Sequence, residues 1–255
     1  MVYYKNIKNE EVVFRAASSS LMPVLLKGPT GCGKTRFIQA MAEKLNRPLI
    51  TVACNDETSA VDLIGRYIVK GGDTIWQEGP VSQAVRQGAI LYLDEIAEAR
   101  EDVITVLHPL GDHRRELFID RHAEIIQAPR EFMLVASFNP GYQKSMKELK
   151  PSIRQRFVTM LFDYPESEIE QEIICHESSC DPAIAKKLVT LANKIRKLEE
   201  LGLTETVSTR LLVHAAKLIQ GDLGPRQSCD VAITQAITDD QDTSQALTDL
   251  ISMVF

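Results

Sequence analysis

The sequence predicts an α/β domain, in which a five-stranded parallel sheet lies between helices, followed by a small all-helical domain. Up to about residue 163, short apolar runs alternate with stretches of helical period, which is typical of a parallel sheet covered by helices. A glycine-rich loop joins the first apolar run to a helix, and beyond residue 164 only helical periodicity remains. We therefore expect two domains, at residues 1–163 and 164–255.

The predicted elements follow from these patterns in chain order. Five apolar runs are the predicted strands, at residues 23–27, 49–53, 89–93, 132–137 and 157–162. The helices of the second domain are predicted at residues 166–176, 181–199, 207–220 and 227–237. Pro165, Pro182, Gly202 and Pro225 separate these helices, because proline and glycine interrupt helical runs.

The loop after the first predicted strand carries the most informative motif of the chain. Its eight residues fit the pattern G-x-x-x-x-G-K-[ST] at every fixed position: Gly28, Pro29, Thr30, Gly31, Cys32, Gly33, Lys34 and Thr35. Glycines let the backbone wrap a phosphate with its N–H groups inward, and the N-terminus of the next helix adds positive charge. We expect Lys34 to reach the β- and γ-phosphates of ATP and the Thr35 hydroxyl to ligate Mg²⁺.

Two acidic residues follow the third predicted strand. Asp94 can hold the Mg²⁺ bound by Thr35, directly or through water. Glu95 then lies near the γ-phosphate, where it can take a proton from the attacking water. Proteins that only bind nucleotides need the first acid but not the second, so the pair predicts ATP hydrolysis. Two solvated carboxylates at an ordinary strand end are the alternative, which the phosphate loop makes the weaker one.

The composition predicts an ordinary globular protein. Of the 255 residues, 44% are hydrophobic and 25% are charged. A net charge of −6 and a pI of about 5.5 argue against a nucleic-acid partner. No apolar run has the length of a membrane span, and the N-terminal residues show no signal-peptide pattern. The five scattered cysteines are interpreted as reduced thiols, and we expect a cytoplasmic protein.

Further motifs accompany the phosphate loop and the acidic pair. They are Asp62-Leu63-Ile64-Gly65-Arg66-Tyr67, Glu78-Gly79-Pro80, Ser137-Phe138-Asn139-Pro140-Gly141-Tyr142-Gln143, Pro151-Ser152-Ile153-Arg154-Gln155-Arg156-Phe157 and Ser208-Thr209-Arg210-Leu211-Leu212-Val213. In this combination, which covers nearly the whole chain, the sequence resembles the MoxR group of AAA+ ATPases, specifically its CbbQ/NorQ branch. The resemblance implies a P-loop AAA+ core followed by a helical lid domain.

The resemblance also implies roles for four polar residues. Asn139, which follows a strand beside that of Asp94, matches sensor 1 and would orient the attacking water; a turn residue before a proline is the alternative. Arg156 is the first choice for the arginine finger that enters a neighbouring subunit's site, and Arg154 is the second. Surface arginines are the alternative for either. Arg210 matches sensor 2, which couples the nucleotide to the lid.

Two insertions mark the MoxR group. Residues 62–76 would form the helix-2 insert, with a tight turn at residues 71–73. Residues 112–128 would form a β-hairpin, in which residues 117–119 pair with residues 124–126. In the family these loops face the ring pore or the client protein. Ordinary connecting structure is the alternative.

The resemblance implies an ATP-driven motor that remodels another protein. Its members form rings, and we expect a hexamer here. In the CbbQ type, a partner with a von Willebrand factor A domain helps the motor to activate rubisco by releasing inhibitory sugar phosphates, and this reading is preferred. In the NorQ type, the client is nitric oxide reductase, which is the alternative. A DNA-acting AAA+ ATPase is less consistent with the acidic composition.

Overall fold

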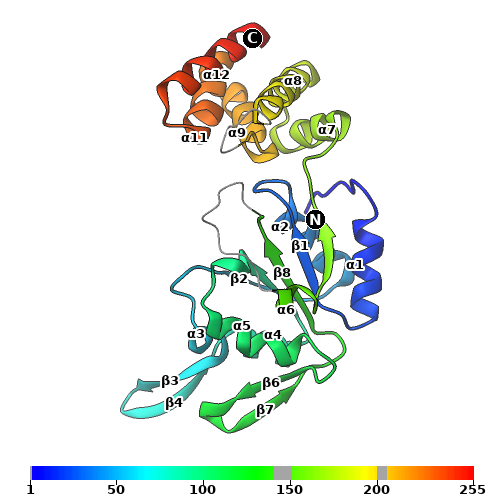
Figure 1. Ribbon diagram of the computed structural model, residues 1–255, viewed down its shortest axis with the longest axis vertical. Coiled ribbons are helices and arrows are strands. Elements are labelled where there is room, and N and C mark those ends of the chain that lie inside the picture. The colour runs from blue at the N-terminus through cyan, green and yellow to red at the C-terminus, as the bar shows by residue number, and fades with distance from the viewer. Residues whose placement is uncertain (1, 141–150, 200–205) are drawn as a thin grey trace. The chain divides into compact units, whose positions relative to one another are not determined.

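The computed structural model describes residues 2–140, 151–199 and 206–255, and its chain forms two compact units (Figure 1). The first unit holds the described residues up to Phe162, apart from the loop tip Pro29–Gly33. The second unit holds Asp163–Phe255 together with that loop tip. Residues 141–143 of the motif that begins at Ser137 lie outside the described residues.

A five-stranded parallel sheet forms the centre of the first unit. Its strands are β1 (Val24–Lys27), β2 (Leu49–Ala53), β5 (Ile90–Asp94), β8 (Met133–Phe138) and β9 (Val158–Leu161). The spatial order is β2-β5-β8-β1-β9, and all neighbours run parallel. The five predicted strands are confirmed, each within one residue of the expected bounds. Because the strands are parallel, their carboxyl ends meet at one edge of the sheet.

Helices cover the sheet on its faces. They are α1 (Glu10–Ser19), α2 (Lys34–Leu45), α3 (Ala60–Ile64), α4 (Pro80–Gln87), α5 (Glu101–Leu107) and the short α6 (Pro151–Arg154). The sequence patterns did not predict α1. Its first residue, Glu10, accepts hydrogen bonds from the backbone amides of Ile7 and Lys8, which fixes the chain that enters the helix.

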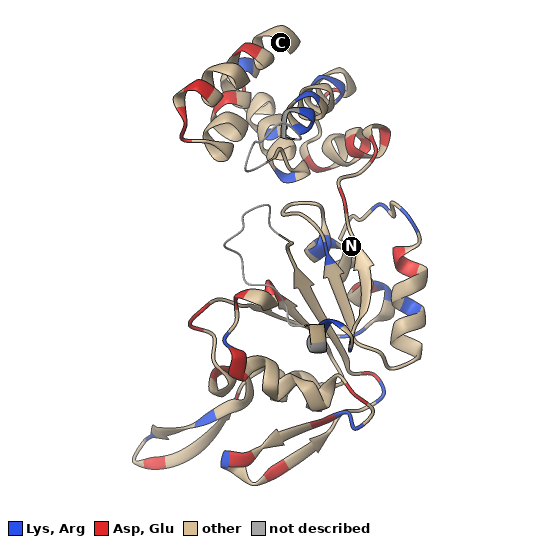
Figure 2. Ribbon diagram, viewed as in Figure 1, with Lys and Arg blue, Asp and Glu red and all other residues tan. Residues whose placement is uncertain are grey.

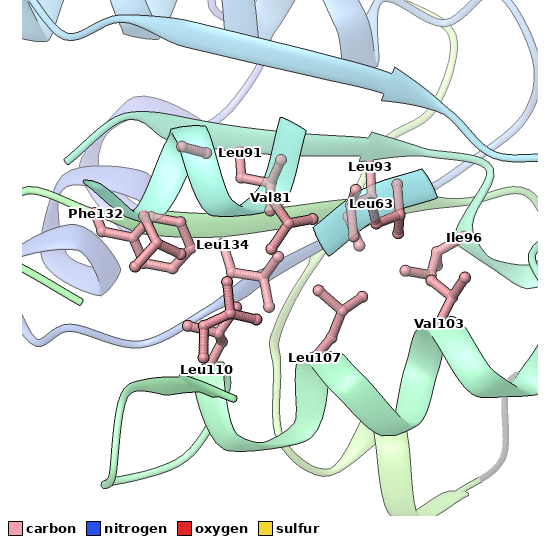
Figure 3. Close-up of a cluster of buried hydrophobic side chains, with 14 of the residues drawn as sticks. Leu63, Val81, Leu91, Leu93, Ile96, Val103, Leu107, Leu110, Phe132 and Leu134 are labelled. Carbon is pink, nitrogen blue, oxygen red and sulfur yellow. The ribbon is translucent and has the colours of Figure 1, made fainter. Parts of the chain in front are cut away.

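Two groups of buried side chains fix these layers. In the first, leucines of β5 and β8 pack against apolar residues of α3, α4 and α5 (Figure 3). Its labelled members are Leu63, Val81, Leu91, Leu93, Ile96, Val103, Leu107, Leu110, Phe132 and Leu134. In the second, the ring of Phe14 on α1 meets that of Phe37 on α2 edge-on, with centroids 5.4 Å apart. Phe37 also contacts the ring of Phe162, which follows β9.

Two antiparallel hairpins extend from the first unit and lie side by side in Figure 1. One pairs β3 (Gly65–Lys70) with β4 (Asp73–Glu78), across the predicted turn at Gly71 and Gly72. The other pairs β6 (Glu116–Ile119) with β7 (Glu124–Gln127). The predicted pairing of residues 117–119 with residues 124–126 is confirmed.

Side chains join the two hairpins to each other. The ring of His122, between β6 and β7, stacks on Trp76 of β4 with centroids 4.9 Å apart. The Tyr67 hydroxyl of β3 lies 2.9 Å from Nδ1 of the same histidine. On α4, Arg86 bonds both Glu78 of β4, at 2.5 Å, and Glu124 of β7, at 2.6 Å. These contacts hold the hairpins together as one body.

The second unit is a helical bundle. Its helices are α7 (Ser167–Ser178), α8 (Pro182–Glu199), α9 (Thr209–Gln220), α10 (Pro225–Cys229), α11 (Gln235–Ile237) and α12 (Gln241–Val254). The predicted helix at residues 227–237 is present as α10 and α11, joined by a π-helical stretch at Asp230–Thr234. An ionic network braces the bundle, because the fully buried Glu170 accepts from Arg196 and from the Thr209 hydroxyl.

The charged residues do not gather by sign in the first unit. Figure 2 shows Lys and Arg interspersed with Asp and Glu along its helices and hairpins. None of the described helices combines the length and the apolar composition that crossing a bilayer requires.

A substitution at Gly79, the residue before α4, tests how closely the start of this helix packs against α3. A Cβ at Gly79 would lie 2.3 Å from the Leu63 carbonyl oxygen. We expect Gly79→Ala to lower the free energy of unfolding of the first unit by about 1–3 kcal/mol, because the backbone of α3 must move. Denaturant unfolding, followed by the fluorescence of Trp76, measures this. Gly111→Ala is the matched control, since its Cβ would have an ordinary 3.7 Å contact; equal losses in both variants would contradict the interpretation.

Candidate active site

The phosphate loop leads from β1 directly into α2. Gly31 has φ +71° and Gly33 has φ +99°, in the left-handed region that favours glycine. Helix α2 begins at Lys34, so the backbone amides of its first turn lie at the end of the loop. The buried Lys34 ammonium donates to the Gly28 carbonyl at 2.8 Å, which folds the side chain back over the loop. The predicted strand, loop and helix are therefore continuous.

One tyrosine brings the two predicted magnesium ligands together. The Tyr92 hydroxyl donates to Asp94 Oδ1 at 2.8 Å and lies 3.4 Å from Thr35 Oγ1. Tyr92 is fully buried, and burial raises the pKa of its hydroxyl, which keeps it protonated as a donor. Thr35 and Asp94 thus approach the same atom, although one begins α2 and the other ends β5.

A buried serine joins the two predicted acids. Ser137, near the end of β8, donates a short hydrogen bond to Asp94 Oδ1 and accepts one from the Glu95 amide at 2.8 Å. Glu95 itself has φ +56°, a left-handed conformation that costs energy for a residue other than glycine. Its side chain is exposed at the carboxyl edge of the sheet. The bent backbone and the serine together set the direction of the Glu95 side chain.

The thiol of Cys54, beside the two acids, is unreactive. Cys54 follows β2 and is buried, and its amide donates to the Asp94 carbonyl at 2.9 Å. Burial raises the pKa of the Cys54 thiol to about 12, with a further contribution from the negative charges of Asp94 and Glu95. The thiol is therefore neutral at physiological pH and adds no charge to the site.

The other predicted site residues come from the end of β8, from α6 and the residues after it, and from α9. Asn139 comes directly after β8, the sheet neighbour of β5, as expected. Arg154 ends α6 and is exposed, whereas Arg156 pairs with Asp112 at 3.2 Å rather than with the phosphate loop. Arg210 is exposed in the first turn of α9, and its Cβ would lie 3.4 Å from a Cβ built on Gly31 of the phosphate-loop tip, which belongs to the same compact unit. The structure thus brings together Lys34, Thr35, Asp94 and Glu95 with Asn139 at the same sheet edge.

Sequence reasoning missed Tyr92 and Ser137, which hold the cluster together. A signal for each was present, because strand side chains alternate between faces with a period of two. That period puts Tyr92 on the same face as Asp94. Ser137 is the one hydroxyl in an otherwise apolar strand of six residues, Met133–Phe138, and a buried hydroxyl needs a partner.

Comparisons with known proteins agree with this geometry. Residues 23–157 match the family model of the AAA domain, dynein-related subfamily. Residues 170–254 match the model described as the CbbQ/NirQ/NorQ C-terminal region. Together the two models cover the phosphate loop, the acidic pair, the arginines before β9 and most of the helical unit.

Two relatives are similar to this chain in sequence, and one solved structure is similar to it in fold. NorQ of Paracoccus denitrificans is 54% identical over 99% of this chain and 94% of its own length. CbbQ of Hydrogenophilus thermoluteolus is 51% identical over 96% of this chain and 92% of its own length. A mutant of RuvB from Thermotoga maritima has the same fold, with a TM-score of 0.59 and 16% identity over 98% of this chain and 71% of that one. The predicted fold class is confirmed.

The serine that joins the two acids can be tested directly. We expect Ser137→Ala to lower kcat about tenfold, since a hydrogen bond to a charged group contributes about 1.5–3 kcal/mol. Affinity for a fluorescent ATP analogue should change little, because the phosphate loop is intact. Ser82→Ala is the matched control, as Ser82 is equally buried and bonds the Ile64 carbonyl outside the site. An unchanged kcat in Ser137→Ala would show that the serine does not position Glu95.

Proposed function

The chain belongs to the CbbQ/NirQ/NorQ family of AAA ATPases, and we propose that it uses ATP hydrolysis to activate a client enzyme. The ATPase activity follows from the family, and the convergence of Thr35, Asp94 and Glu95 at one sheet edge supports the assignment of roles. In this assignment the phosphate loop binds ATP through its backbone amides and through Lys34. Glu95 takes the proton of the attacking water.

The donor set fits Mg²⁺. The Thr35 hydroxyl and the Asp94 carboxylate are hard oxygen donors, and both contact the Tyr92 hydroxyl oxygen. Two protein ligands leave the other coordination positions of Mg²⁺ to phosphate oxygens and water, which this ion usually keeps as ligands. When bound, the ion would neutralise charge on the β- and γ-phosphates. Tyr92 and Ser137 keep the Asp94 carboxylate in place for this purpose.

A second subunit completes the proposed site. Arg156 pairs with Asp112 in its own subunit and not with the phosphate loop, which suits a finger that acts on a neighbour. Arg154 stays the second candidate. Asn139 is proposed to orient the attacking water, and Arg210 to report the nucleotide state to the helical unit. This arrangement requires a ring, and we propose a hexamer.

The two hairpins are the proposed elements through which the ATPase acts on its client. Four large hydrophobic side chains are exposed on them, with accessible fractions of 40% to 76%: Tyr67, Val69, Ile75 and Ile125. An apolar surface that a protein keeps exposed is a frequent site of protein contact. Because Trp76, His122 and Arg86 join the hairpins, client force on one is transmitted to the other.

The client is proposed from the family resemblance. Rubisco with an inhibitory sugar phosphate is the CbbQ-type client, and nitric oxide reductase is the NorQ-type client, each with a partner that carries a von Willebrand factor A domain. The identities of 54% to a NorQ and 51% to a CbbQ do not separate the two. We propose a cytoplasmic activator without a nucleic-acid partner, in agreement with the net charge of −6.

Two substitutions separate binding from hydrolysis. We expect Lys34→Ala to abolish ATP binding, because the phosphates lose their charged partner. We expect Glu95→Gln to bind ATP with near wild-type affinity but to stop turnover, because the base is lost while the phosphate loop is intact. Equilibrium binding of a fluorescent ATP analogue and phosphate release measure the two effects. Wild-type turnover by Glu95→Gln would exclude Glu95 as the base.

The client and the hairpin are tested in one reconstitution. The protein, ATP and a von Willebrand factor A partner are incubated either with sugar-phosphate-inhibited rubisco or with inactive nitric oxide reductase, and recovery of the client's activity is measured. We expect recovery of one client, and a several-fold smaller recovery per ATP hydrolysed with Ile125→Ser. Val12→Ser is the control, since Val12 is 68% exposed on α1, away from the hairpins. Recovery of neither client would refute the proposed function, and equal losses in both variants would refute the role of the hairpin.

A further inference from the structure

A carboxylate just before the β6–β7 hairpin contacts the proposed arginine finger. Asp112 Oδ2 accepts a hydrogen bond from Arg156 Nη1 at 3.2 Å, across 44 positions of sequence. We propose that Asp112 is a positioning residue for Arg156, and that it couples the β6–β7 hairpin to ATP hydrolysis in the neighbouring subunit. This inference rests on the finger role that the proposed function gives to Arg156.

The Asp112 carboxylate is itself held in place. Arg114 donates to it from Nε at 3.1 Å, from Nη2 at 2.7 Å and from the backbone amide at 3.0 Å. This contact at both carboxylate oxygens fixes the orientation of the group. The Arg114 side chain also holds the pKa of Asp112 well below its usual range, so the group is ionised at neutral pH. Arg156 therefore meets an acceptor of fixed position and constant charge.

The same segment is bonded to the base of the hairpin. Gln127, the last residue of β7, donates from Nε2 to the Arg114 carbonyl at 2.8 Å. The next amide, that of Ala128, donates to the Arg115 carbonyl at 2.8 Å. A displacement of the hairpin strands therefore moves the backbone that carries Arg114, and with it the Asp112 carboxylate.

The surroundings of Arg156 favour a role in orientation over one in stability. Its side chain is 35% exposed, and ion pairs at this exposure contribute only about 0–1 kcal/mol to folding. Asp112 bonds Nη1, one of the two terminal nitrogens of the Arg156 guanidinium, and the guanidinium stays at the protein surface. Nearby, burial and then the positive charge of Arg156 lower the pKa of His108, so this imidazole is neutral at neutral pH. Asp112 is thus a charged group that fixes the direction of the finger.

The expected effects distinguish positioning from a general structural role. We expect Asp112→Asn to lower kcat about tenfold with little change in KM for ATP, because a misplaced catalytic group slows chemistry while the phosphate loop is intact. Arg156→Ala should lower kcat roughly 10³-fold. In the Arg156→Ala background, Asp112→Asn should cause no further loss, since it acts through the missing side chain.

Mixed rings test the action on the neighbour. Asp112→Asn subunits retain Glu95, and Glu95→Gln subunits retain both Asp112 and Arg156. Mixing them should raise the turnover per intact Glu95 toward the wild-type value, with mixed assembly verified by light scattering and mass spectrometry. Arg156→Ala subunits mixed with Glu95→Gln subunits provide the reference. Glu11→Gln is the matched control, because it changes a carboxylate that pairs with Arg15 and Lys44 on α1; its turnover should be unchanged.

The outcomes separate this inference from the proposed function. Three results would overturn the role of Asp112 and leave the finger role of Arg156 intact. They are wild-type turnover by Asp112→Asn, a turnover above wild type, and a full additional loss of kcat when Asp112→Asn is added to Arg156→Ala. Wild-type turnover by Arg156→Ala would overturn the finger itself, and the role of Asp112 with it. If Asp112→Asn does not assemble, Asp112→Glu replaces it and should lower kcat several-fold, but only where Arg156 is present.

Discussion

The Asp94 carboxylate is the point on which the order of the active site depends. It lies at the carboxyl end of β5, next to the central strand of the sheet, and it accepts from the side chains of Tyr92 and Ser137. Through Tyr92 it reaches α2, and through Ser137 it reaches β8 and the backbone of Glu95. A single carboxylate thus aligns three segments. This alignment is possible because parallel strands bring their carboxyl ends to one edge.

Much of the fold could be predicted from local pattern, because buried strands and the glycine loop have local signatures. The runs 49–53 and 132–137 are apolar and short, and a five-stranded sheet follows from their alternation with helices. Helix α1 escaped prediction, because its apolar stripe is short and its start depends on Glu10 bonding to the preceding backbone. The π-helical stretch at Asp230–Thr234 was missed for a similar reason, since helical periodicity does not reveal a widened turn.

The candidate site was predictable wherever a residue's role depends on its neighbours in sequence. Lys34, Thr35, Asp94 and Glu95 belong to contiguous motifs, so their types and spacing were informative. Contacts between segments that are distant in sequence were not predictable. The bond from Arg156 to Asp112 joins residues 44 apart, and the stacking of His122 on Trp76 joins two hairpins, so neither leaves a periodic trace. Such contacts depend on tertiary packing, which single-sequence patterns do not encode.

The left-handed backbone of Glu95 has a consequence for how this protein can change. Holding a side chain other than glycine at φ +56° costs on the order of 1 kcal/mol, and a glycine there would remove that strain. At this position, therefore, thermal stability favours glycine whereas the proposed catalytic role requires glutamate. Selection for stability alone would favour loss of the acid. In this chain the fold bears that conformational cost and holds an exposed carboxylate at the sheet edge.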